Sequence, residues 1–125
     1  MRHLSVEILE AIHSSVLNPA ELAGKARDKS LEATLARVQN RLIYGMIDDI
    51  FHLAALYAMV IARGHCFNDG NKRTAFKAME VCLEANDISL AWNTEDVGDK
   101  IILVAQGILD DVDLAEWLRG LPSAP

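Results

Sequence analysis

The sequence predicts an all-α fold, a single domain over residues 1–125 made of about six helices. Apolar residues make up 51% of the chain but aromatics only 6%, a composition that suits helices packed on helices. In most segments the apolar residues recur at three- and four-residue spacing, the period of an amphipathic helix. A chain of 125 residues can bury most of the surface that it exposes when unfolded. We find no internal repeat, low-complexity tract or interdomain linker.

Two helices are predicted before the long apolar run. The first covers residues 5–17, with Ser5 as its N-cap. Its predicted inward side chains are Ile8, Leu9, Ile12 and Val16. A loop is expected over residues 19–29. Ser30 then caps a second helix that continues to about residue 40. Its predicted inward side chains are Leu31, Leu35 and Val38.

The central helix is the most apolar part of the chain. Residues 41–45, before it, are either a short extended piece or a continuation of the second helix. Asp48 or Asp49 starts the central helix, and Gly64 ends it as a left-handed cap. The apolar run at residues 50–62 is shorter than the roughly 20 residues that span a bilayer. A helix buried on most sides is therefore expected.

Three further elements are expected toward the C-terminus. A helix over residues 71–85 carries a buried stripe of Ala75, Ala78, Met79 and Cys82. Residues 88–92 form a short extended connection. Asn93 or Thr94 caps the next helix, whose predicted inward side chains are Val97, Ile101, Val104 and Ala105. Asp111 or Asp113 caps the last helix.

A polar stretch over residues 63–75 separates the central helix from the next one. From residue 63 to residue 77 there are four Lys/Arg and one Asp, a local balance of +3 in a chain of net charge −6. Lys72 and Arg73 fall in the first turn of a helix, where the helix dipole opposes cations by about 0.3–1 kcal/mol each. A bound polyanion reverses that sign, and Gly70 lets such a ligand approach the backbone. The stretch therefore predicts a site for a phosphate-bearing ligand.

Two residues of this stretch are candidates for chemistry. His65 can take a proton from an attacking hydroxyl, because its ordinary pKa lies near neutrality. Asp69 can hold a hard divalent cation, Mg²⁺ being the best fit to oxygen ligation. Each has a structural alternative: His65 could fill a helix-to-loop corner, and Asp69 could cap the following helix.

The other polar residues are weighed in the same way. Asn71 is a candidate phosphate ligand or a residue that holds the loop through bonds to the backbone. Arg73 is a phosphate ligand or a surface cation paired with Glu80. We expect Phe67 to anchor the loop in the core and do not expect Cys66 to act as a nucleophile. The remaining histidines are treated as surface or packing residues: His3, His13 and His52.

The stretch resembles the signature of the Fic/Doc family, H-x-F-x-[DE]-G-N-G-R-x-x-R. The matching run is His65-x-Phe67-x-Asp69-Gly70-Asn71-Lys72-Arg73-Thr74-Ala75. Lys72 stands in place of a glycine, and Phe76 stands in place of the second arginine. Both departures are typical of the Doc (death-on-curing) branch. A weaker likeness covers Gly24-x-x-Arg27-Asp28 and Leu31-Glu32-x-x-Leu35.

The resemblance implies a toxin of a toxin–antitoxin pair. Doc-like proteins are kinases that phosphorylate a threonine of translation elongation factor Tu and arrest translation. ATP would be the substrate and Mg²⁺ the metal, with His65 as general base and Asp69 as metal ligand. Gly70, Asn71, Lys72 and Arg73 would bind the phosphates. A Fic-type adenylyltransferase and a non-catalytic binding module of this fold are the alternatives. The intact His65 and Asp69 speak against the module.

The resemblance also bears on regulation and on the target. No glutamate of the chain is followed by Gly or Asn, so the inhibitory [ST]-x-x-x-E-[GN] motif of many Fic enzymes is absent. We therefore expect a separate antitoxin, whose C-terminal helical segment packs into a groove formed by the N-terminal helices and a flap. The resemblance suggests Arg41–Gly45 as that flap. Tyr44 is then either a target contact or an ordinary packing aromatic.

Composition excludes several classes of protein. An acidic chain is a poor non-specific ligand for nucleic acid, so no direct binding to it is expected. The N-terminus does not look like a secretory signal, and no membrane partner is expected. Two separated cysteines, Cys66 and Cys82, fit a reducing cytoplasm. Residues 95–116 carry seven Asp/Glu and one Lys, either a solvated face or a docking surface for a basic partner.

Overall fold

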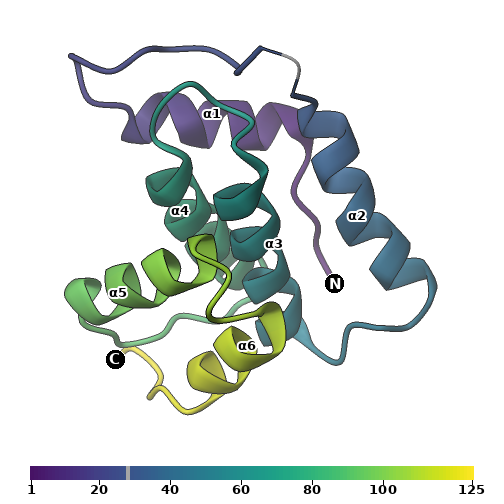
Figure 1. The fold of residues 1–125 in the computed structure, drawn as a ribbon. Coiled ribbons are helices and arrows are strands. Elements are labelled where there is room, and N and C mark those ends of the chain that lie inside the picture. Colours follow the sequence, from purple (N-terminus) through teal and green to yellow (C-terminus); the bar gives the residue numbers. More distant parts are fainter. Residues whose placement is uncertain (28) are drawn as a thin grey trace.

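The computed structural model describes residues 1–27 and 29–125. It has six helices, in the order α1 (Val6–Val16), α2 (Leu31–Ile43), α3 (Ile50–Gly64), α4 (Asn71–Ala85), α5 (Thr94–Ala105) and α6 (Asp111–Arg119). Two isolated bridges are the only β pairing among the described residues. The predicted all-α class is confirmed (Figure 1). Asp28, part of the weaker N-terminal likeness, lies outside the described residues.

Helix α3 is the centre of the fold. All of its residues from His52 to Ala62 are buried. It contacts α2, α4, α5 and α6, while α1 packs on α4 and α2 (Figure 1). A helix that is apolar all round must be covered on all sides, and α3 is. None of the helices in the described part of the chain is both long and apolar enough to cross a membrane.

Most helix starts agree with the sequence. Ser5, Ser30, Asp49 and Asn93 each accept a backbone N–H of the first turn, as N-caps do. The last helix differs, because its N-cap is Asp110, which forms a reciprocal capping box with a carboxylate three residues on. The predicted caps Asp111 and Asp113 are therefore wrong: Asp113 is the box partner, and Asp111 is buried.

The inward faces are confirmed for α2 and the buried stripe of α4. In α1 the prediction for Ile8 is wrong, because its side chain is 41% exposed. His13 is buried instead, at 3% exposure. The buried face of α1 thus includes the imidazole of His13, whereas Ile8 is exposed.

Of the two possibilities for residues 41–45, the continuation of the second helix is confirmed, and the short extended flap is not present. Helix α2 continues to Ile43, and Ile43 and Tyr44 are 74% and 77% exposed. Residues 41–45 lie before the start of α3, whereas the motif follows the end of α3. A helix of 15 residues separates the two, which is about 22 Å at 1.5 Å per residue.

The chain end closes the far side of the molecule. Leu90 forms an antiparallel bridge with Ser123, and Ala91 N–H donates to the carbonyl of Pro122 at 2.8 Å. The extended connection predicted over residues 88–92 is therefore present between α4 and α5.

Candidate functional site

His65 begins the loop that joins α3 to α4. It is the C-cap of α3 and has left-handed backbone angles, φ 50° and ψ 40°. Gly64, predicted for that role, is instead the last helical residue. A histidine in this region costs on the order of 1 kcal/mol more than a glycine would. The turn leaves the imidazole exposed to solvent, open to a substrate.

Asn71 closes the loop from the α4 side. Its Oδ1 accepts the N–H of Phe67 at 3.1 Å, and its Nδ2 donates to the carbonyl of the same residue at 2.9 Å. The Phe67 ring is buried at 3% exposure, as predicted. The loop-holding role considered for Asn71 is thus present, and its backbone N–H at the start of α4 is available to a ligand.

His13 supports the loop from below. Its ring stacks on Phe67, with centroids 3.9 Å apart and planes 7° apart. Its Nε2 lies 2.7 Å from the carbonyl oxygen of Asp69. Since that oxygen can only accept, Nε2 carries the proton. The sequence interpretation of His13 as a plain packing residue missed this bond, which joins positions 56 residues apart.

A second support comes from residues 18–27, which we call the cover segment. Ala26 N–H donates to Cys66 carbonyl at 2.7 Å, and Asn68 N–H donates to Gly24 carbonyl at 3.2 Å. Lys25 and Phe67 form the antiparallel bridge between these bonds. In Figure 1 the connection from α1 to α2 arches over the α3–α4 loop. The cover segment thus pairs with the motif loop along its backbone.

Asp69 points its carboxylate toward the cover segment. Its Oδ2 accepts the N–H of Leu22 at 2.8 Å. The alternative of an N-cap is wrong, because Gly70 occupies that position and α4 has no side-chain cap. Oδ1 of Asp69 takes no hydrogen bond within residues 1–27 and 29–125 and is left to bind a cation. No group of three metal-ligating side chains occurs among these residues. A single carboxylate oxygen is a hard donor of the kind that Mg²⁺ accepts beside water and phosphate oxygens.

The start of α4 is an uncapped helix N-terminus. The first backbone bond of this helix runs from Thr74 N–H to Gly70 carbonyl, at 2.9 Å. The amides of residues 71–73 therefore precede the helical ladder and can face an anion. Gly70 has φ 79°, and a Cβ there would lie 3.3 Å from Nη2 of Arg73. Glycine thus suits both the turn and the space beside the arginine.

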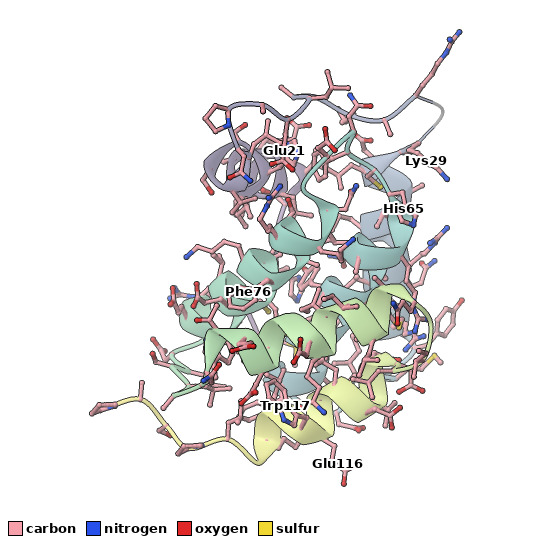
Figure 2. All side chains as sticks on the ribbon, turned by 60° about the vertical axis from the view of Figure 1, so that its left-hand side comes forward. Glu21, Lys29, His65, Phe76, Glu116 and Trp117 are labelled. Atoms are coloured by element: carbon pink, nitrogen blue, oxygen red, sulfur yellow. The ribbon has the colours of Figure 1, made fainter. Side chains whose placement is uncertain are left out.

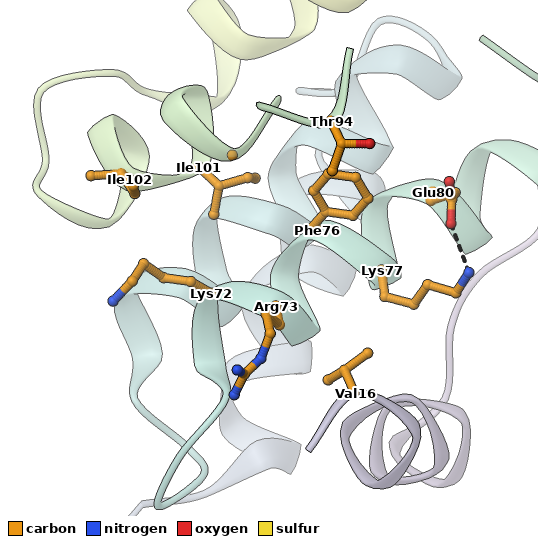
Figure 3. A pocket seen from close by; sticks show the side chains of 10 residues that line it. Val16, Lys72, Arg73, Phe76, Lys77, Glu80, Thr94, Ile101 and Ile102 are labelled. Atoms are coloured by element: carbon orange, nitrogen blue, oxygen red, sulfur yellow. Dashed lines mark hydrogen bonds and ion pairs between the residues drawn. The ribbon is translucent and has the colours of Figure 1, made fainter. Parts of the chain in front are cut away.

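Two cavities meet at Lys72 and Arg73. One, of about 280 Å³, is lined by Glu21, Asp69, Gly70, Asn71, Lys72 and Arg73. The other, of about 500 Å³, lies between α4, α5 and the end of α1, as Figure 3 shows. Its lining is largely aliphatic and aromatic, including Val16, Phe76 and Ile101. A polar cavity and a larger, more apolar one thus share Lys72 and Arg73 in their linings.

Arg73 already has an anionic partner inside the chain. Its Nη2 donates to Oε1 of Glu21. The guanidinium lowers the pKa of Glu21, helped by a backbone N–H of Asn18. The suggested pair of Arg73 with Glu80 is wrong, because Glu80 pairs with Lys77 at 2.7 Å. Lys72 is exposed and has no ion pair within the described part of the chain.

Phosphate binding needs cations that face a cavity, and proton transfer needs an imidazole that a substrate can reach. Both first-turn cations line cavities, and the imidazole is open to solvent. His65 and Glu21 lie at the same end of the molecule, with Trp117 at the other (Figure 2). Residues 3–83, which hold α1 to α3, the motif loop and most of α4, match the Fic/DOC family.

The chain belongs to the Fic/Doc family.

Within that family it falls in the Doc branch. Over 122 residues it is 35% identical to the protein named Protein kinase doc of Escherichia phage P1. The match covers 97% of this chain and 96% of the phage protein. The likeness of this Fic/Doc chain therefore extends well past the motif, through α5 and α6.

Proposed function

We propose that this Fic/Doc protein is a Doc-like toxin, a protein kinase that transfers the terminal phosphoryl group of ATP to a threonine hydroxyl of translation elongation factor Tu. The observation that carries the proposal is an exposed histidine in the short loop that leads into an uncapped, cationic helix N-terminus. The name of the phage relative supports phosphoryl transfer as the reaction. Translation would stop when the factor is modified.

Each motif residue has a task in this reaction. His65 accepts the proton of the target hydroxyl as the hydroxyl oxygen bonds to the terminal phosphorus and ADP leaves. Lys72, Arg73 and the backbone amides after Gly70 neutralise phosphate charge, which is the main demand of this chemistry. Asp69 would hold Mg²⁺, and the ion would supply further charge neutralisation. Asn71 and His13 keep the loop that presents these groups in one shape.

The proposed toxin also needs an antitoxin. An amphipathic helical segment laid into an apolar groove is a common way to block such a surface. The cavity of about 500 Å³ supports such a site. Helix α1 contributes Val16 to it, but α4 and α5 supply most of its lining, so the groove extends beyond the N-terminal helices.

Intact-mass spectrometry of elongation factor Tu tests the proposal. After incubation with the protein, ATP and Mg²⁺, we expect a gain of one phosphoryl group and transfer of label from γ-labelled but not α-labelled ATP. The variant His65→Asn should lose this activity, while His3→Asn, at an exposed histidine outside the motif, should keep it. Asparagine tolerates left-handed backbone angles, so the first variant should not suffer from strain.

The other outcomes assign the rival functions. A gain matching one adenylyl group, with label from the α position, would identify an adenylyltransferase. An unmodified factor, together with undiminished toxicity of His65→Asn on expression without antitoxin, would indicate a non-catalytic binding module.

A further inference from the structure

We propose that Glu21 is an internal competitor for the phosphate site, which holds Arg73 until a nucleotide phosphate displaces it and so sets the affinity for the nucleotide. The inference rests on the nucleotide site of the proposed function and adds a residue that the motif does not contain. Glu21 lies in the cover segment, 52 positions before its partner.

The Glu21 carboxylate occupies the place where a phosphate would bind. It lines the cavity of about 280 Å³ together with Asp69 and the first residues of α4. Oε1 accepts from both Nη2 of Arg73 and the N–H of Asn18, the latter at 2.8 Å. A carboxylate beside an uncapped helix start is a smaller anion in a site suited to a larger one.

The pairing leaves Arg73 incompletely used. Its Nε is buried and has no hydrogen-bond partner among the described residues. A guanidinium binds oxyanions best through two parallel N–H donors. Here the contact with Glu21 uses Nη2 alone. A phosphate offers three oxygens and can engage the free Nε as well, which favours exchange of the carboxylate for the ligand.

Charge balance points the same way. Two carboxylates, Glu21 and Asp69, face two cations, Lys72 and Arg73, around one cavity. The charges of the side chains that line this cavity therefore nearly cancel. An entering polyanion meets a like charge at Glu21, so either the side chain moves away or the ligand is repelled. In both cases the glutamate weakens nucleotide binding.

The Glu21 side chain can move away from Arg73 without breaking the contacts that hold the cover segment on the motif loop. The cover segment is held on the motif by backbone groups of Leu22, Gly24 and Ala26. None of these bonds uses the Glu21 side chain. Its carboxylate and that of Asp69 are held by different groups, so displacement at Arg73 leaves the Asp69 carboxylate bonded to Leu22.

The opposite role for Glu21 would be to orient Arg73 toward the phosphate. The two roles predict opposite changes in nucleotide affinity when Glu21 is replaced. Removing a competitor tightens nucleotide binding, whereas removing an orienting partner weakens it. The charge must therefore be removed at constant side-chain size, as Glu21→Gln does.

Calorimetric titration of the full chain with ATP and Mg²⁺, and separately with pyrophosphate, measures this sign. A partly exposed ion pair contributes little energy, so we expect Glu21→Gln to lower the Kd for both ligands by about two- to five-fold. Glu10→Gln is the matched control, because it removes one carboxylate that pairs with Lys25 of the cover segment at 3.2 Å but does not line the cavity. It should leave both Kd values unchanged.

The outcomes distinguish the role of Glu21 from the presence of a nucleotide site. If the parent protein binds ATP and Glu21→Gln binds it no tighter, the inference is overturned and the proposed function stands. Equal tightening in Glu10→Gln would assign the effect to a loosened cover segment and also overturn it. If neither parent nor variant binds ATP or pyrophosphate, the nucleotide site itself is refuted.

Discussion

At the scale of single residues, the motif loop depends on side chains that do no chemistry. His13 holds the carbonyl of Asp69 and the ring of Phe67, and Asn71 bonds both backbone groups of Phe67. These contacts fix the loop from two helices that are separate in the sequence. The positions of His65 and Asp69 therefore follow from α1 and α4 as much as from the loop itself.

The substitution His13→Phe should separate packing from hydrogen bonding. The flat ring remains against Phe67, but the donor to Asp69 carbonyl is lost. We expect kcat for the phosphoryl transfer to fall about five- to ten-fold and the free energy of unfolding by about 1 kcal/mol. His13→Ala should lose about 3 kcal/mol, because the stacked ring goes as well. A parental kcat in His13→Phe would show that the bond has no positioning role.

The substitution Asn71→Ala removes two bonds to Phe67. We expect about 1–2 kcal/mol of lost stability, measured by urea unfolding, and a larger fractional loss of activity than of folded protein. Asn68→Ala is the control. It lies on the same loop as Phe67, and it removes one exposed hydrogen bond to the carbonyl of Ala23 in the cover segment. If both variants lose activity equally, Asn71 is not the residue that shapes the loop.

At the scale of elements, the far end of the fold is fixed by a charge cluster around the buried carboxylate of Asp111. Oδ2 of Asp111 contacts Nε2 of His52 at 2.7 Å and Nη1 of Arg41 at 2.6 Å. One carboxylate thereby joins α6 to α3 and α2. Burial alone would raise the pKa of Asp111, but the bonds to His52 and Arg41 outweigh it and the pKa is lowered.

Asp111→Asn should weaken this junction. We expect the free energy of unfolding at neutral pH to fall by about 2–3 kcal/mol, since two partners lose a buried charge. A lowered carboxyl pKa gives stability that is present above the unfolded value of about 4 and is lost as pH falls through the folded value. The variant should thus show a shallower loss of stability in acid. Asp99→Asn, at an exposed position, should retain the parental pH profile.

The elements themselves could be predicted because their signals are local. Apolar spacing and caps such as Ser5 and Asn93 lie within one or two turns of what they determine. Several contacts that complete the site join residues far apart in the sequence: Leu22 and Asp69 are 47 positions apart, and His13 and Asp69 are 56. Nothing in a local pattern encodes which distant loop covers the motif. The flap at Arg41–Gly45 is suggested by the family resemblance, and that resemblance does not identify the segment that covers the motif here.

At the scale of the whole molecule, α3 links the two ends. Its first turn holds His52 of the charge cluster, and its C-cap is His65. Four other helices pack on it. A cavity-forming substitution in the middle of α3 should therefore lower the stability of the whole fold and not of one part.

Leu56→Ala tests this dependence. The side chain is 1% exposed in the middle of α3, so we expect a loss of about 2–5 kcal/mol. Far-ultraviolet circular dichroism and tryptophan fluorescence should report one coincident transition. Ile43→Ala, at a side chain that is 74% exposed, should change stability by less than about 0.5 kcal/mol. Two separate transitions would show that the helices do not unfold as one unit.

The position of Glu21 outside any helix has a consequence for how such proteins diverge. Substitutions in a connection between helices leave the buried framework untouched. If Glu21 competes with the nucleotide as proposed, substitutions at this partly buried position change nucleotide affinity and leave the packed helices intact, so the strength of the proposed activity can diverge between relatives without loss of the fold.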